Sequence, residues 1–225
     1  MDSPTPFLTA DGSHSLRSPA GISYHSTHGA IQESQHIFIE YGLLPLLRDE
    51  HPRDLNILEM GFGTGLNALL VRAVAANHPG TRFAYTTFER YPVGGEQVRQ
   101  LNYPARLGLP AERFFQLHDA PWGEPTQLDA NFVLHKRRED FLGTGPHPAR
   151  PVELIIYDAF APENQPELWT PEAMRQCYAW LKPGGRLLTY CAKGQFKRNL
   201  RVAGFRVERL PGPVGKREIT RAFRD

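Results

Sequence analysis

The stretch "ILEMGFGTGLNALL" (residues 57–70) joins an apolar run to a glycine-rich turn and then to a helix-like segment. The apolar run begins at Leu55 and is typical of a buried β-strand, whereas residues 65–78 carry apolar side chains at helical spacing. Gly61, Gly63 and Gly65 let the backbone turn tightly and approach a ligand, and the first N–H groups of the following helix are unpaired. The stretch therefore predicts a strand, a ligand-binding turn and a helix.

Strand-like and helix-like segments alternate along most of the chain. Strands are expected at residues 55–60, 81–90, 130–136, 151–160, 186–191, 205–210 and 217–223, and helices at 65–78, 94–103, 170–182 and 195–204. Thr170 and Pro171 suit the N-cap and first position of the third helix. The alternation indicates an α/β fold with an open, mostly parallel, seven-stranded sheet. Because the last two strands are joined by a short turn, we expect the last strand to be antiparallel.

Residues 1–50 stand outside this alternation. The segment "LTADGSHSLRSPAGISYHSTHG" (8–29) has turn signals at Asp11-Gly12 and at residues 19–21, and predicts a hairpin. The segment "AIQESQHIFIEYGLLPLL" (30–47) predicts a partly apolar helix ended by Gly42 and Pro45. We expect residues 1–50 to form an extension that covers the site, and residues 51–225 to form the α/β domain.

Composition excludes several classes of protein. The 225 residues are 40% hydrophobic and 22% charged, which is enough to bury a full core, and no uncharged apolar run approaches the ~18 residues of a membrane span. Cys177 and Cys191 are too few for a disulfide framework and fit a reducing cytoplasm. His25, His28 and His36 share one segment, but no cysteine or second cluster completes a ligand set, so we expect no metal.

Positive charge is concentrated near the C-terminal end. Residues 182–225 hold twelve of the 26 Lys and Arg residues but only three of the 24 Asp and Glu residues. Phosphates are bound chiefly by Lys and Arg, so this asymmetry favours a polyanionic partner such as a nucleic acid. A solvated basic face without a partner is the alternative that composition leaves open.

The residues around the glycines favour S-adenosylmethionine over a dinucleotide. A dinucleotide turn has the pattern G-x-G-x-x-G, and Leu66 stands where its third glycine would be. Glu59 would repel a pyrophosphate but suits the cationic amino-acid end of S-adenosylmethionine. Glu89, which ends the second strand, can accept hydrogen bonds from ribose hydroxyls. Asp140 follows the next strand and is either an adenine contact or a loop acid.

Asp158 lies at the end of the apolar run in "LIIYDAFAPENQPELW" (154–169). Loops at the carboxyl ends of strands in open α/β sheets are where ligands bind. A carboxylate at this point can hold an amine and accept its proton, which frees the lone pair for methyl transfer. Phe160 and Pro162 would then form a stiff wall beside a planar base. A helix-capping or strand-end role for Asp158 is the alternative.

Five motifs in the same order make the chain similar to a known family. They are "YHSTHGAIQESQHIFIEYGL" (24–43), "ILEMGFGTGLNALL" (57–70), "YDAFAPENQPELWTPE" (157–172), "LKPGGRLLTYCAKGQFKRNLRVAGF" (181–205) and "GKRE" (215–218). Together they resemble the methyltransferase domain of the MnmC family, which acts on the wobble uridine of tRNA, and the resemblance runs from about Leu8 to Arg221. The resemblance is strongest to the stand-alone form, often called MnmD.

The resemblance implies a class I, Rossmann-like fold that uses S-adenosylmethionine to methylate the primary amine of 5-aminomethyl-2-thiouridine. Asp158 matches the residue proposed to orient or deprotonate that amine. The bifunctional members also carry a flavin oxidase domain; we expect this chain to lack it, so that separate upstream enzymes supply the aminomethyl group. The resemblance assigns the cofactor to Tyr24, Glu59, Gly61, Phe62, Gly63, Thr64, Gly65, Asn67, Glu89, Asp140 and Asp158.

The basic lobe then gains an expected partner, the anticodon stem-loop of tRNA. Recognition of a base in a loop requires that base to be splayed out while the protein holds the flanking phosphates. The residues expected to contact the substrate are Phe160, Pro162, Trp169, Lys193, Lys197, Arg198, Lys216 and Arg217. Trp169 is equally well explained as a packed anchor. A methyltransferase for another amine, or an RNA-binding protein without activity, are the competing interpretations.

Overall fold

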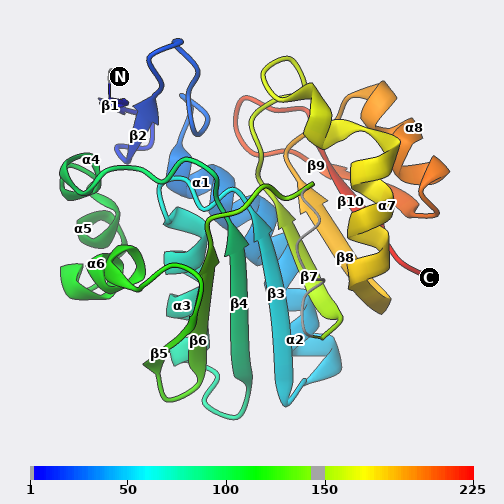
Figure 1. Cartoon of the computed structure of the whole chain (residues 1–225), viewed down its shortest axis with the longest axis horizontal. Helices are drawn as coiled ribbons and strands as arrows, with labels where there is room; N and C mark the ends of the chain where they lie inside the picture. The colour runs from blue at the N-terminus through cyan, green and yellow to red at the C-terminus, as the bar shows by residue number, and fades with distance from the viewer. Residues whose placement is uncertain (1–2, 143–149) are drawn as a thin grey trace.

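The computed structural model describes residues 3–142 and 150–225, and within them eight strands form one sheet beside a small N-terminal hairpin (Figure 1). The order across the sheet is β5-β6-β4-β3-β7-β8-β10-β9. Strands β6, β4, β3, β7 and β8 run parallel, and β10 is antiparallel to both of its neighbours. The strands are β3 (Asp54–Met60), β4 (Arg82–Phe88), β5 (Pro125–Asp129), β6 (Phe132–Arg137), β7 (Val152–Tyr157), β8 (Leu181–Thr189), β9 (Arg206–Pro211) and β10 (Glu218–Phe223).

The predicted α/β class and the antiparallel last strand are confirmed, but the expected number of seven strands is wrong. The additional strand is β5, which pairs antiparallel with β6 at the edge of the sheet. It is partly exposed along its length and interrupted by an irregularity in register between Gln127 and Asp129. An edge strand of this kind lacks the continuous apolar run that marks the central strands, which is why its sequence gives a weak signal.

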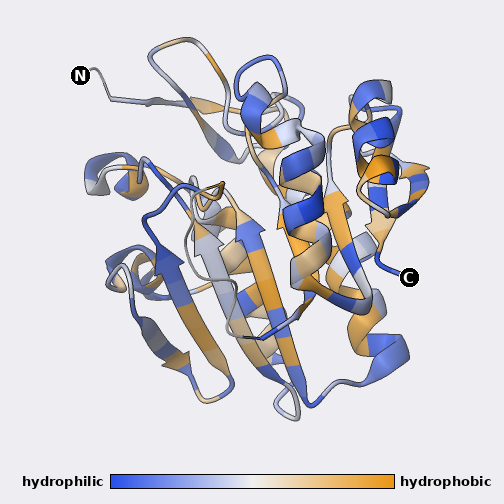
Figure 2. Ribbon diagram, turned by 45° about the vertical axis from the view of Figure 1, so that its right-hand side comes forward, coloured by the Kyte–Doolittle hydropathy of each residue, from blue (hydrophilic) through white to orange (hydrophobic). Residues whose placement is uncertain are grey.

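Helices cover both faces of the sheet (Figure 1). One face carries α3 (Leu66–Ala76) and the N-terminal helical segments, and the other carries α7 (Pro171–Trp180) and α8 (Gly194–Val202). Every residue of β7 is buried, in keeping with its central place, and Figure 2 shows hydrophobic residues concentrated along the central strands. Thr170 caps α7 by accepting a hydrogen bond from the Ala173 N–H at 3.2 Å, as predicted.

The N-terminal residues form the predicted hairpin, followed by a longer helix than predicted. Strands β1 (Thr5–Leu8) and β2 (His14–Arg17) pair antiparallel around the turn at Asp11-Gly12. The helix does not end at Gly42 or Pro45 but continues as α1 (Ala30–Ser34), a π-helix η1 (Gln35–Leu43) and α2 (Leu44–Glu50). Pro45 falls in the first turn of α2, where a missing N–H is tolerated. Gly42 faces Leu188 and Leu154, so the helix packs closely on the sheet.

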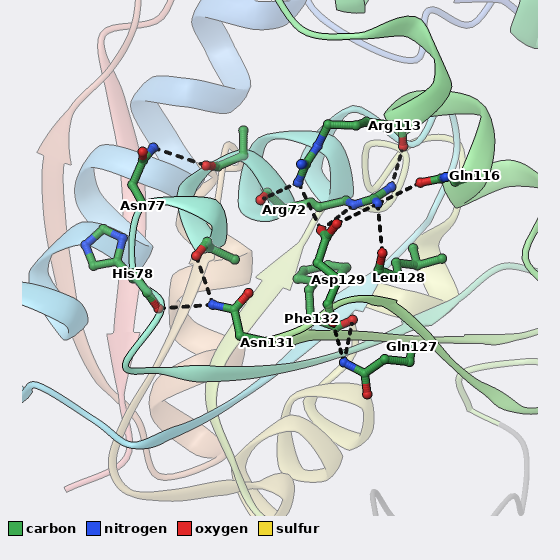
Figure 3. A network of polar contacts seen from close by, with 12 residues as sticks. Arg72, Asn77, His78, Arg113, Gln116, Gln127, Leu128, Asp129, Asn131 and Phe132 are labelled. Atoms are coloured by element: carbon green, nitrogen blue, oxygen red, sulfur yellow. Dashed lines mark hydrogen bonds and ion pairs between the residues drawn. The ribbon is translucent and has the colours of Figure 1, made fainter.

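A buried arginine links α3 to the far edge of the sheet (Figure 3). Three short helices, α4 (Gly95–Arg99), α5 (Tyr103–Leu107) and α6 (Ala111–Asp119), precede β5. Arg72 of α3 is 1% exposed and makes two hydrogen bonds to the Asp129 carboxylate, at 2.7 and 3.0 Å, and one to the Arg113 carbonyl of α6. This network fixes the helix that starts at the glycine turn. No helix in the described ranges has the length and apolar character needed to cross a membrane.

Candidate active site

The carboxyl ends of β3 and β7 mark the point where the order of strands reverses. The chain passes from β3 to β4 on one side, whereas β7 lies against β3 on the other. The loops that follow β3 and β7 therefore diverge and leave a crevice, the usual ligand site of open α/β sheets. The Asp158 N–H donates to the Met60 carbonyl at 3.1 Å, so the two loops start side by side.

A cavity of about 330 Å³ opens at this point and is large enough for a small-molecule ligand. Its lining residues come from the segments that follow β3, β4, β6 and β7, together with Tyr24 and His25 of the N-terminal extension. Most of the residues predicted to bind the cofactor line it. They are Tyr24, Gly61, Phe62, Gly63, Thr64, Asn67, Glu89, Asp140 and Asp158, together with Phe160 from the predicted substrate group.

The glycine turn is shaped by contacts that other residues would obstruct. Gly61 has a φ of 88°, and a Cβ atom there would lie 3.0 Å from the Asp158 carbonyl oxygen. Gly65 has a φ of 75° and precedes α3, where a Cβ would lie 2.7 Å from Nε2 of His118. Positive φ values of this kind favour glycine. The turn thus brings the backbone close to β7 and leaves the start of α3 open toward the cavity.

Glu89 joins the glycine turn to the loop after β4. Its carboxylate accepts a hydrogen bond from the Gly63 N–H at 3.0 Å and another from the Tyr91 N–H at 2.7 Å. Asp140 also lines the cavity, but it accepts from the Leu142 N–H at 3.0 Å and pairs with Arg90 at 3.2 Å. A carboxylate has about four acceptor sites, so Glu89 retains capacity for ribose hydroxyls, as a cofactor of this type requires.

Asp158 contributes a carboxylate to the cavity from the loop after β7. The Asn67 amide donates to its Oδ2 at 2.8 Å. Burial, together with the negative charge of Glu33, raises the pKa of Asp158 to about 7. The group can therefore exchange a proton near neutral pH, as a general base does.

The remainder of the loop after β7 is held by packing. Phe160 meets the Tyr24 ring edge-on, with 5.0 Å between the ring centroids. Trp169 is buried and donates from Nε1 to the Phe160 carbonyl at 2.8 Å, so it anchors this loop from behind. Neither Trp169 nor Pro162 lines the cavity.

Glu59 lies beneath the glycine turn and does not line the cavity. Its side chain is fully buried, and no described residue gives either carboxylate oxygen a hydrogen bond of good geometry. Burial raises the pKa of Glu59 to about 8, and the neighbouring Thr87 hydroxyl offsets this only in part. Near neutral pH a proton on Glu59 is therefore favoured, which differs from the expected carboxylate facing a cationic cofactor group.

The basic residues predicted to hold RNA divide into two groups. Lys197 is 5% exposed and pairs with Glu218, while Lys193 pairs with Glu163. Lys216 pairs with Glu33 at 2.5 Å. Arg198 and Arg217 are exposed. None of these five side chains lines the cavity, so any contact with RNA lies outside it.

Two histidines, His25 and His118, support the glycine turn, and no motif in the sequence pointed to His118. His25 Nε2 lies 2.8 Å from Thr64 Oγ1, and His118 Nε2 lies 3.1 Å from the Thr64 carbonyl. Burial lowers the pKa of each histidine to about 4, so both are neutral near pH 7. Within the described part of the chain, no group of His, Cys, Asp and Glu has the arrangement of a metal site.

Comparison with known proteins agrees with this geometry. A family model described as S-adenosyl-L-methionine-dependent methyltransferase matches residues 139–225. The tRNA 5-methylaminomethyl-2-thiouridine biosynthesis bifunctional protein MnmC of Cupriavidus necator is 31% identical over 210 residues, which is 88% of this chain and 31% of that protein. The chain is thus related to the MnmC proteins and is an S-adenosyl-L-methionine-dependent methyltransferase. S-adenosyl-L-methionine is therefore its cofactor.

Other relatives give the same result. MnmC of Aeromonas hydrophila is 28% identical over 223 residues, covering 91% of this chain and 33% of that protein. The chain thus spans about a third of the length of the curated relatives it matches. The crystal structure of MNMC2 from Aquifex aeolicus superposes with a TM-score of 0.82 at 24% identity, covering 100% of this chain and 71% of that one. This likeness shows the class I methyltransferase fold.

Proposed function

We propose that the protein transfers the methyl group of S-adenosylmethionine to the primary amine of 5-aminomethyl-uridine or its 2-thio form at the tRNA wobble position. The product is the 5-methylaminomethyl nucleoside after which the MnmC relatives are named. The observation that carries the proposal is Asp158, a carboxylate that titrates near pH 7 in the wall of the cofactor cavity.

The cofactor would lie along the carboxyl ends of β4, β3 and β7. Glu89 would accept the ribose hydroxyls, and Asp140 marks the adenine end of the cavity. The methionine end and its methyl group would then approach Asn67 and Asp158, which are hydrogen-bonded to each other. S-adenosylmethionine supplies an electrophilic methyl group, and the protein's part is to align a nucleophile with it.

Asp158 would prepare that nucleophile. An alkyl amine in water is mostly protonated near neutral pH and has no lone pair to attack with, so a proton must leave before methyl transfer. A carboxylate with a pKa of about 7 can hold the ammonium group by charge and accept this proton, which leaves a neutral amine whose lone pair then attacks the methyl group. Phe160 and Tyr24, which pack edge to face, would enclose the uracil ring beside it.

Exposed arginines outside the cavity would hold the anticodon stem-loop. Arg198 lies on α8, and Arg217 lies in the turn before β10; both are exposed and belong to the basic segment of the chain. Lys197 is unsuited to this role because it is buried against Glu218. A tRNA substrate would also place the protein in the cytoplasm.

The test is methyl transfer from labelled S-adenosylmethionine to anticodon stem-loops that carry either 5-aminomethyl-2-thiouridine or plain uridine at the wobble position. We expect label only in the aminomethyl RNA, and a rate at least ~100-fold lower for Asp158→Asn. Label in plain uridine would contradict an amine acceptor, and full activity of Asp158→Asn would contradict the assigned base. Failure with the RNA but transfer to a free amine would support an amine methyltransferase of another specificity.

A further inference from the structure

An ion pair outside the cavity, whose two charges act on Asp158, has no part in the proposed reaction so far. Glu33 of α1 lies 2.5 Å from Lys216, which belongs to the turn between β9 and β10. The Glu33 side chain is 9% exposed and that of Lys216 is 27% exposed. A lysine in such a position is poorly placed to hold an RNA phosphate and well placed to act on its neighbours in the protein.

Both members of the pair are fixed by further contacts. The Ser26 N–H donates to the second Glu33 oxygen at 2.9 Å, and the Lys216 ammonium lies 4.1 Å from the centre of the Tyr190 ring. Tyr190 in turn donates to the Ala159 carbonyl at 2.8 Å, beside Asp158. The pair is therefore connected to the loop that carries the carboxylate.

The turn that carries Lys216 is pressed against the N-terminal segment. Gly215 has a φ of 86°, and a Cβ atom there would lie 2.2 Å from the His28 ring. His36 Nε2 lies 2.9 Å from the Pro211 carbonyl on the same side. Parts of the chain almost 200 residues apart thus meet to place one negative and one positive charge beside the site.

Few other groups near Asp158 carry a charge at neutral pH. Those that interact with it electrostatically are Glu33 of α1, Lys216, Glu59 of β3, Tyr85 of β4, Tyr103 of α5 and Tyr190 after β8. Burial raises the pKa of Glu59 to about 8 and holds the pKa of each of the three tyrosines above its ordinary value. The cavity acids Glu89 and Asp140 follow β4 and β6, on the far side of β3.

We propose that Glu33 and Lys216 are positioning residues whose opposed charges set the protonation of Asp158 and so the pH range in which the amine is activated. The proposal rests on the proposed function, because it gives Asp158 the role of accepting the amine proton. Glu33 favours the protonated form of Asp158 and Lys216 favours the ionised form. Neither side chain needs to touch the substrate.

The two charges have opposite effects, and this makes the proposal testable. In Glu33→Gln the positive charge of Lys216 is unopposed, so the acidic limb of the pH–rate profile should move to lower pH by about half a unit or more. In Lys216→Met the limb should move to higher pH by a similar amount. In the double variant the two changes should largely cancel. A role confined to folding would lower the rate of both single variants without moving the limb in opposite directions.

The experiment measures single-turnover methyl transfer to the aminomethyl stem-loop against pH for the four proteins. In parallel, the carboxyl carbon of Asp158 is titrated by NMR in the cofactor-free proteins, with its signal identified by its loss in Asp158→Asn. Opposite shifts in both measurements support the proposal. The proposal is overturned if the two single variants leave the acidic limb and the titration midpoint of Asp158 unmoved, or if they move them in the same direction. If no protein methylates the RNA, the proposed function fails, and the NMR titration alone still decides whether the pair controls Asp158.

Discussion

Glu59 provides a sharp test because its environment ties protonation to stability. The carboxyl group is fully buried, and its pKa is raised from 4.5 to about 8. Between these two values the folded state holds a proton that the unfolded state releases. The stabilising contribution is therefore complete below about pH 4.5 and is lost as the pH rises toward 8. Each pH unit in this window costs about 1.4 kcal/mol of unfolding free energy.

The perturbation is Glu59→Gln, which keeps the shape of the side chain but cannot ionise. From about pH 5.5 to 7.0, the free energy of unfolding of the unsubstituted protein should fall by about 2 kcal/mol relative to that of the variant. The assay is urea unfolding of the cofactor-free protein at a series of pH values. Ile219→Val, at a buried apolar position of β10 that is separated from β3 by β7 and β8, is the control and should show a difference independent of pH. A constant difference for Glu59→Gln as well would refute the assignment of a proton to Glu59.

Three further substitutions test other parts of the structure. Arg72→Met should lower the unfolding free energy by about 3 kcal/mol in urea titrations, because the Arg113 and Leu128 carbonyls lose their donor and Asp129 keeps only Arg113; a loss below about 1 kcal/mol would contradict this. Gly61→Ala should weaken cofactor binding at least ~10-fold in calorimetry, whereas Gly21→Ala, with a φ of 80° and no neighbour within 4 Å, should not. Arg198→Ala and Arg217→Ala should each remove about one phosphate contact and so reduce the slope of log affinity for RNA against log salt concentration. Arg82→Ala, at an exposed position at the opposite end of β4, should leave this slope unchanged.

The sequence predicted the site because the site depends on local patterns. A glycine turn after a buried strand, an acid after the next strand and Asp158 after a third are each readable over a few residues. Parallel strands bring their carboxyl ends to one edge, so these local signals converge without any knowledge of strand order. The order did matter for one contact: only the pairing of β3 with β7 brings Asn67 within 2.8 Å of Asp158.

The burial of Glu59 was partly readable from the sequence, and its predicted contact with the cofactor stays a prediction. Side chains alternate along a strand, so Glu59 shares a face with Ile57, a residue of the core packed by α3 and η1. That parity directs Glu59 under the glycine turn. The prediction for Glu59 rested instead on the chemical match between a carboxylate and a cationic cofactor group. The direction of the side chain decides which groups it can reach.

Composition could not predict which basic side chains are exposed and which are buried in ion pairs. Lys197 follows Phe196 on α8, and both are buried there, while Arg198 is exposed. Whether a lysine meets solvent or an acid such as Glu218 depends on contacts between segments about 20 residues apart. A count of charges therefore indicates the sign of a surface, but it does not separate the side chains that hold the fold from those free to bind RNA.

The carboxylates of the site differ in their burial and in their hydrogen-bond partners, and these differences give each a separate chemistry. Glu89 accepts from two backbone N–H groups. Asp158 accepts from Asn67, and Glu59 accepts from no described residue with good geometry. Burial raises the pKa of both groups, and the negative charge of Asp158 adds to this effect at Glu59, so a proton is retained to higher pH on Glu59 than on Asp158. A neutral Glu59 removes a negative charge that would otherwise push the pKa of Asp158 further up, away from neutrality, where a general base works best.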